Sequence, residues 1–121
     1  MQSENNIILE KSMQFAIRCV NLYKYLCESK REYVLSKQMV RSGTSIGANI
    51  KEGVQGQSKP DFISKLSISL KEASETEYWV ELLYKTKYIN IQEYESIKSD
   101  CIELIKLLTS ILKTARKNLE K

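Results

Sequence analysis

Residues 90–119 read NIQEYESIKSDCIELIKLLTSILKTARKNL, and the order of apolar and polar residues in this segment is typical of an amphipathic helix. Its apolar side chains recur at steps of three and four residues, which places them on one face. Asn90 and Glu93 have the spacing of a capping box, so we predict that the helix begins near residue 91. The predicted buried stripe consists of Tyr94, Ile97, Cys101, Leu104, Leu108, Ile111 and Ala115.

Three earlier segments have the same period, and we predict helices over about 6–28, 33–52 and 59–85. Ser58 suits the N-cap of the third helix, with Asp61 three residues on, and Pro60 falls in its first turn. Gly53 and Gly56 are expected to end the second helix, because Gly adopts the left-handed conformation most easily. The predicted stripes are Leu9, Met13, Ala16, Ile17, Val20 and Tyr23 in the first helix and Leu35, Met39, Ser42, Ile46, Asn49 and Ile50 in the second.

The composition agrees with long helices in one domain. The chain has 121 residues, which fits a single domain over 1–121, and only four Gly and one Pro. Short connections make neighbouring helices antiparallel, so the predicted fold is all-α, an up-down-up-down four-helix bundle. Gly43 and Gly47, inside the second helix, are expected to let a neighbouring helix pack closely.

The third segment carries apolar residues on two sides. Phe62, Leu66, Leu70, Ala73, Val80 and Tyr84 line one face, whereas Ile68, Trp79 and Leu82 lie roughly opposite. A monomeric bundle buries only one face, so we predict that the other is an oligomer interface. Scattered surface hydrophobes are the alternative, and the sequence leaves open which face forms the core.

Polar residues interrupt the apolar stripes of the second and third helices. Buried polar groups without partners are costly, so these residues are expected to bond to one another. A satisfied network that fixes helix register or subunit pairing is one interpretation, and a ligand or ion site is the other. The predicted network consists of Gln38, Arg41, Ser42, Asn49, Glu72 and Glu75.

The sequence lacks the residues that several kinds of catalytic and metal site require. The chain has no His, which removes His-activated nucleophiles, His-containing zinc sites and the di-iron carboxylate bundle. Cys19, Cys27 and Cys101 lack metal-ligand spacing and are expected to be small buried side chains in a reduced, cytoplasmic protein. No apolar run is long enough for a membrane span. We therefore expect no enzyme activity, no catalytic residue, no cofactor and no metal.

The net charge is only +4, but basic residues gather in two places. Lys113, Arg116 and Lys117 lie near the C-terminus, while Lys51 and Lys59 flank the turn between the second and third helices. These five are the predicted nucleic-acid contacts, and an ordinary solvated surface is the alternative. Tyrosines near helix ends could stack on bases, although such residues more often serve in packing; they are Tyr23, Tyr25 and Tyr33.

Residues 38–53, QMVRSGTSIGANIKEG, resemble the signature of the proteins encoded within intervening sequences of 23S ribosomal RNA genes, often labelled S23 ribosomal protein. The similarity continues through 58–62, 66–68 and 71–79, and it extends from about Ile7 to Thr114. One departure is Lys51, where many relatives carry a small residue.

The resemblance implies an antiparallel four-helix bundle that assembles into a ring, a homopentamer, with a link to RNA. Similar bundles are accessory proteins of diversity-generating retroelements, where a basic pentamer partners a reverse transcriptase. Three hypotheses follow: an RNA-associated oligomer, a scaffold for a protein partner such as a reverse transcriptase, and a carboxylate-lined ligand or metal site on the third helix.

Overall fold

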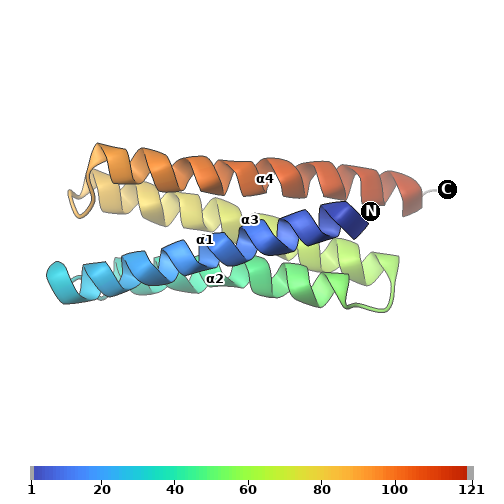
Figure 1. The fold of residues 1–121 in the computed structure, drawn as a ribbon, viewed down its shortest axis with the longest axis horizontal. Coiled ribbons are helices and arrows are strands. Elements are labelled where there is room, and N and C mark those ends of the chain that lie inside the picture. The colour runs from blue at the N-terminus through green and yellow to red at the C-terminus, as the bar shows by residue number, and fades with distance from the viewer. Residues whose placement is uncertain (1, 120–121) are drawn as a thin grey trace.

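The computed structural model describes residues 2–119 and contains four helices in this range, α1 (Gln2–Ser29), α2 (Leu35–Val54), α3 (Lys59–Lys85) and α4 (Ile91–Leu119). Figure 1 shows that successive helices run in opposite directions, so the predicted all-α, up-down-up-down bundle is confirmed. The predicted bounds of α3 and α4 are correct. Helix α1 begins four residues earlier than predicted, and α2 begins and ends two residues later.

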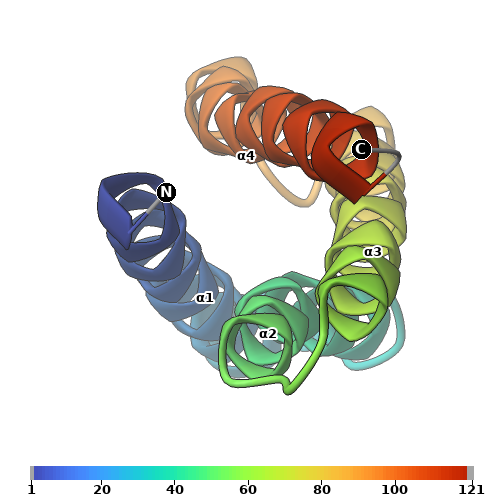
Figure 2. The same cartoon turned by 90° about the vertical axis from the view of Figure 1, so that its right-hand side faces the viewer.

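The bundle has two ends of different make-up (Figure 1). One end holds the 55–58 turn together with the first residues of α1 and the last residues of α4, and we call it the terminal end. The other holds the 30–34 and 86–90 turns, and we call it the double-turn end. Each helix packs most closely on its neighbours in sequence, and of the four pairs of adjacent helices α1 and α4 are the least closely packed, as the end-on view shows (Figure 2).

Local capping chemistry sets the starts of α3 and α4. The Ser58 hydroxyl accepts the Asp61 N–H at 3.2 Å, as predicted. The Glu93 N–H donates to Asn90 Oδ1 at 2.8 Å, and the Asn90 N–H donates to Glu93 Oε1 at 3.0 Å. These contacts satisfy N–H groups that a helix leaves unpaired in its first turn.

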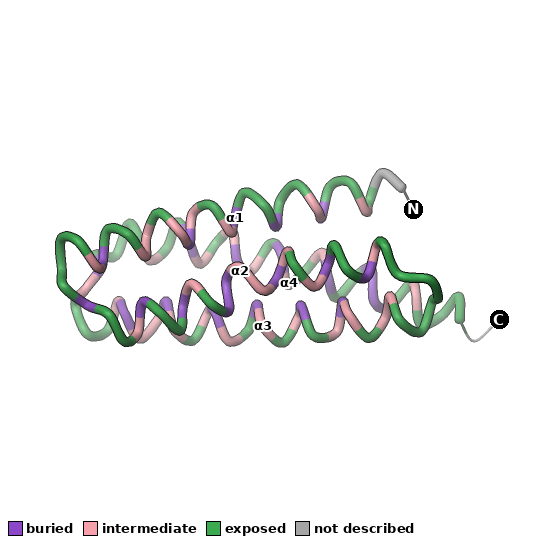
Figure 3. Tube along the Cα trace, turned by 90° about the horizontal axis from the view of Figure 1, so that it is seen from below, coloured by how far each residue is buried: buried purple, intermediate pink, exposed green. Residues whose placement is uncertain are grey.

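The core lies along the inward sides of the four helices (Figure 3). Helix α3 buries Leu66, Ala73 and Val80, which settles the question of which of its faces forms the core. In α4 the predicted stripe is buried from Ile97 to Ile111, while Tyr94 and Ala115 are half-buried. Helix α2 buries its stripe as well, except that Leu35 and Asn49 are half-buried.

The predicted stripe of α1 is wrong by one residue step. Met13 is 57% exposed and Ile17 is 45% exposed, whereas the core receives the neighbouring stripe. The reason is twofold: the large Phe15 removes more apolar area from water than an alanine or methionine face does, and small residues beside it fit against α2. The buried stripe consists of Ile8, Ser12, Phe15, Cys19 and Leu26.

Glycines in α2 allow the close packing that the sequence predicted. A Cβ atom on Gly43 would overlap the Cys19 thiol, and one on Gly47 would lie 3.1 Å from Ser12 Oγ. The prediction that Gly53 and Gly56 end α2 in the left-handed conformation is wrong, because α2 ends at Val54 and no described glycine has a positive φ. Gly53 instead makes room for α3, since its Cβ would lie 2.8 Å from Leu66 Cδ1.

The start of α2 is capped by Glu32, which the sequence pattern did not indicate. The buried Glu32 carboxylate accepts the backbone N–H groups of Val34 (3.0 Å), Leu35 (2.9 Å) and Ser36 (2.7 Å). Burial raises the pKa of Glu32, but these three donors together outweigh burial and hold the pKa below its ordinary value of 4.5. The carboxylate therefore ties the 30–34 turn to α2.

Candidate nucleic-acid interface and polar network

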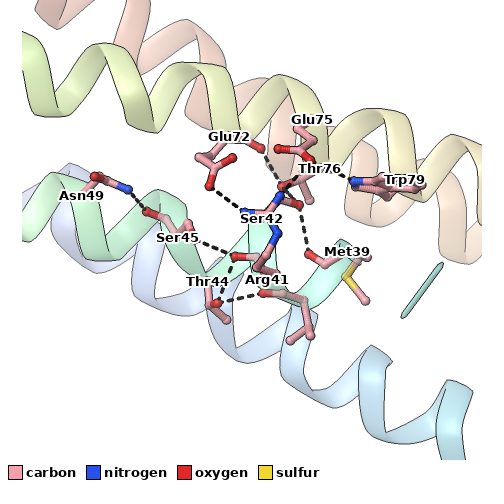
Figure 4. A network of polar contacts seen from close by, with 11 residues as sticks. Met39, Arg41, Ser42, Thr44, Ser45, Asn49, Glu72, Glu75, Thr76 and Trp79 are labelled. Atoms are coloured by element: carbon pink, nitrogen blue, oxygen red, sulfur yellow. Dashed lines mark hydrogen bonds and ion pairs between the residues drawn. The ribbon is translucent and has the colours of Figure 1, made fainter. Parts of the chain in front are cut away.

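A polar network joins α2 to α3 on the outer side of the core (Figure 4). Arg41 Nη1 donates to Glu72 Oε2 at 3.3 Å, and Arg41 Nη2 donates to Glu75 Oε1 at 2.8 Å. Trp79 Nε1 also points at Glu75 Oε1, at 3.4 Å. One guanidinium thus bridges two carboxylates that lie a turn apart on α3.

Hydroxyl groups continue the network into the core. Thr76 Oγ1 lies 2.8 Å from both Ser42 Oγ and the Glu72 carbonyl oxygen, and the Ser42 hydroxyl donates to the Met39 carbonyl at 3.2 Å. Ser69 donates to the Ile46 carbonyl across the interface at 2.8 Å. In the described residues every buried side-chain N or O atom has a partner.

The structure therefore brings together four of the six predicted network residues, Arg41, Ser42, Glu72 and Glu75. Asn49 donates instead to the Ser45 carbonyl of its own helix at 2.8 Å. Gln38 is exposed and lies outside the network. Between residues 2 and 119, no three His, Cys, Asp or Glu side chains form a group that could hold a metal ion.

The two carboxyls behave differently. Burial, followed by the hydrogen bond with Glu75, raises the pKa of Glu72. The hydrogen bond with Glu72 lowers the pKa of Glu75, against the effect of burial, and Arg41 lowers it further. Glu72 therefore takes up a proton first as the pH falls, and Glu75 retains the ion pair with Arg41.

The two buried cysteines are poor nucleophiles. Burial raises the pKa of Cys19 to about 12. It also raises the pKa of Cys101 to about 12, and the Cys101 thiol donates to the Ala73 carbonyl at 3.2 Å. The thiolate is the reactive form of cysteine, so both groups act as small packing residues. Cys27 is only half-buried, unlike the prediction.

All five predicted nucleic-acid contacts are exposed and lie toward the terminal end. Lys51 and Lys59 flank the 55–58 turn, and the others occupy the last two turns of α4. Arg116 Nη2 donates to Ser67 Oγ at 3.1 Å, which fixes its guanidinium beside α3. A surface depression of about 330 Å³ lies between these elements, with Ser58, Lys59 and Asn118 in its wall.

Helices α1 and α3 each present a group of apolar side chains to solvent. On α3, Ile68 is 43% exposed, while Trp79 and Leu82 are half-buried beside the exposed Tyr78. On α1, Met13 and Ile17 form the stripe that the sequence analysis had assigned to the core. Two adjacent apolar stripes in the sequence of α1 indicate this exposed face, because the core can bury only one of them.

These features define a class: a small all-α bundle with a structural polar network, exposed apolar faces on two helices and a basic end. The family model described as 23S rRNA-intervening sequence protein matches residues 4–110, and the chain belongs to this family. A crystal structure of a protein of unknown function from the S23 ribosomal protein family of Bacteroides thetaiotaomicron is similar, with 58% identity and a TM-score of 0.90. That match covers 91% of this chain and 98% of the other.

No curated protein matches the chain. Among the described residues, no helix has the length and apolar character that crossing a membrane requires.

Proposed function

We propose that this chain is a non-enzymatic homo-oligomer that associates with RNA through its terminal end. One observation carries the proposal: the basic side chains that the sequence singled out come from three helices and gather at one end of the bundle. Within residues 2–119 none of them is in an ion pair. The set consists of Lys51, Lys59, Lys113, Arg116 and Lys117.

A helix terminus also supports phosphate binding there. The exposed N-terminus of α3 begins with Lys59, is capped by Ser58 and shares a surface depression with the end of α4, and helix N-termini attract anions. A single chain offers few contacts, but a ring such as a homopentamer would repeat them around one face. Phosphate contacts then add, and the affinity falls steeply with salt.

Self-association through α3 is part of the proposal. Ile68, Trp79 and Leu82 lie on one exposed flank, and the Arg41–Glu72–Glu75 bridge borders it. A rim of ion pairs around an apolar patch is the usual anatomy of a protein interface. The network would then fix the geometry of the surface that meets the next subunit.

The RNA experiment is fluorescence anisotropy with a labelled structured RNA and nuclease-treated protein at two salt concentrations. We expect the double variant Lys59→Gln/Lys117→Gln to bind more weakly and to show a salt slope smaller by about 0.7–0.9 for each lost contact. Lys71→Gln/Lys106→Gln removes the same charge from exposed positions outside the terminal end and serves as the control. Absence of binding well above micromolar protein, even at low salt, would exclude direct RNA association.

The assembly experiment is sedimentation velocity of Ile68→Lys beside Met13→Lys. Both positions are exposed, so neither charge should unfold the bundle. We expect Ile68→Lys to reduce the assembly to monomers and Met13→Lys to leave it intact. The reverse result would place the interface on α1.

A scaffold for a protein partner is the second candidate, and the exposed stripe of Met13 and Ile17 on α1 favours it, because exposed apolar surface is typical of protein interaction sites. A partner such as a reverse transcriptase would then bind stably while RNA binding stayed weak and insensitive to salt. The third hypothesis, a divalent cation on Glu72 and Glu75, gains no support, because the Arg41 guanidinium already bridges both carboxylates.

A further inference from the structure

Aromatic side chains concentrate at the double-turn end, far from the basic residues of the terminal end. The chain has seven tyrosines, and all lie near the ends of α1 and α3, near the start of α4, or in the 30–34 and 86–90 turns. Tyr25 is 38% exposed and Tyr33 is 55% exposed. This distribution leaves several phenol rings in contact with solvent at one end of the molecule.

Three of these rings line an open surface depression of about 400 Å³ between the two turns, which we call the tyrosine cavity. Tyr84 in its wall is already stacked on Tyr94, with centroids 4.6 Å apart and planes 6° from parallel. The rings therefore offer a rigid flat surface. The cavity is lined chiefly by Tyr25, Tyr84, Tyr88, Lys30, Lys87 and Asn90.

Two lysines in the wall are free to meet an anion. Lys30 and Lys87 are exposed, and neither is in an ion pair with a described residue, whereas Lys85 nearby is held by Glu81 at 3.1 Å. Glu93 is the one acidic residue in the wall, and its Oε1 accepts the Asn90 N–H. The cavity thus has two positive charges against one negative charge.

The backbone of both turns reverses the chain directly after a helix end. The two described non-glycine residues with positive φ are Arg31 (51°) and Lys87 (70°), one in each turn at this end. This conformation is costly for side chains of this kind, and glycine or asparagine would fit it better. At Lys87 the conformation belongs to the end of α3, where the Lys87 N–H donates to the Tyr84 carbonyl and the Tyr88 N–H donates to the Leu83 carbonyl, both at 2.9 Å.

We propose that the cavity binds an unpaired nucleotide of single-stranded RNA. The base stacks against the tyrosine rings, and Lys30 and Lys87 contact the flanking phosphates. The Asn90 side-chain amide, whose oxygen is taken up by the Glu93 N–H at 2.8 Å, keeps its NH₂ group for a base oxygen. Stacking accepts any base, so the site has little sequence preference. The site is separate from the terminal end and does not depend on it.

The test uses a fluorescein-labelled oligoadenylate RNA, a blunt RNA duplex of equal length, and the full chain. The variant is Tyr25→Leu/Lys87→Gly. Gly suits the φ of Lys87 and Leu keeps apolar area, so thermal melting should show an intact fold. The control Tyr33→Leu/Lys37→Gln also removes one tyrosine and one lysine, both exposed and outside the cavity.

We expect the cavity variant to bind oligoadenylate about tenfold more weakly, the control to stay within about twofold, and duplex binding to be unchanged. Equal losses in variant and control, equal losses on duplex and single strand, or no oligoadenylate binding by the wild type would each overturn the inference. The variant Lys59→Gln/Lys117→Gln separates the two proposals. If it binds structured RNA as tightly as the wild type does, the proposal for the terminal end is wrong and the proposal for the tyrosine cavity is unaffected.

Discussion

The α2–α3 interface and the seam between α1 and α4 bring helices together by opposite means. Small residues and hydroxyls make the first: Gly53 lets Leu66 approach, and Thr76 and Ser69 bond across the interface. Long charged side chains span the second, where Lys11 meets Glu103 at 3.3 Å and Arg18 meets Asp100 at 2.7 Å. Depressions of about 400 Å³ and 500 Å³ lie along that seam.

The difference teaches where the stability of the bundle resides. Close packing with hydrogen-bonded hydroxyls removes apolar surface from water and leaves no polar group unpaired. A substitution in such an interface therefore lowers the stability of the fold. Half-exposed ion pairs contribute little, because solvent screens them. We therefore expect substitutions beside α2 to be costly and those along the seam to be cheap.

The largest expected effect is at Gly43, where a side chain would overlap Cys19 and also approach Thr76. Gly43→Val should destabilise the protein by about 3 kcal/mol, because overpacking forces α1 away from α2. Urea unfolding gives the value. Ala48→Val, an exposed position of the same helix, controls for the low helix propensity of valine, and equal losses at both positions would contradict the close-packing account.

The next effect depends on pH and concerns the turn that joins α1 to α2. Because the folded pKa of Glu32 is lowered, its contribution is fully present above 4.5 and disappears as the pH falls through the lower folded value. Glu32→Gln should cost about 1–2 kcal/mol at pH 7 and converge with the wild type in acid. Thermal melting across pH measures this, with the exposed Glu28→Gln as the control; a constant difference at all pH values would rule out the carboxylate cap.

A smaller effect is expected for the hydroxyl between α2 and α3. Thr76→Val keeps the shape of the side chain but removes the hydrogen bond between Thr76 Oγ1 and Ser42 Oγ. The Ser42 hydroxyl still donates to the Met39 carbonyl. We expect a loss of about 1 kcal/mol in chemical denaturation. The matched substitution Thr109→Val lies on the exposed side of α4 and should change stability by less than about 0.5 kcal/mol.

The smallest effect belongs to the seam. Arg18→Gln breaks the 2.7 Å contact with Asp100, yet both side chains are close to half-exposed. The expected cost is about 0.5 kcal/mol or less, and it should vanish in high salt. Lys24→Gln provides the charge control on the same helix. If Arg18→Gln lowers the free energy of unfolding as much as Thr76→Val does, the contacts between α1 and α4 contribute more to stability than we expect.

The sequence predicted best what local chemistry decides. The starts of α3 and α4 follow from Ser58 and Asn90, whose capping bonds need only the next three residues. The sequence did not predict which face of α1 is buried, because two adjacent apolar stripes compete. The glycines of α2 select the stripe that contains small residues. The Glu32 cap was missed because a charged run also suits an open turn.

The candidate sites divide in the same way. An up-down topology and short turns suffice to bring Lys51 and Lys59 to the same end as the tail of α4. The tyrosine cavity needs the positions of two turns that are far apart in the chain, and so Tyr25 was noted as a possible stacking residue without Tyr84 and Tyr88.

Gln2 and Leu119 lie at the same end of the bundle (Figure 1). An affinity tag, a fusion partner or a sensor surface attached to either terminus therefore sits beside Lys59 and Arg116 and points the tyrosine cavity outward. Immobilising the chain by a terminus hinders ligand access to one proposed site and leaves the other open. Swapping that attachment for one through an engineered residue in the 86–90 turn reverses the exposure, so surface chemistry alone can separate the two binding activities.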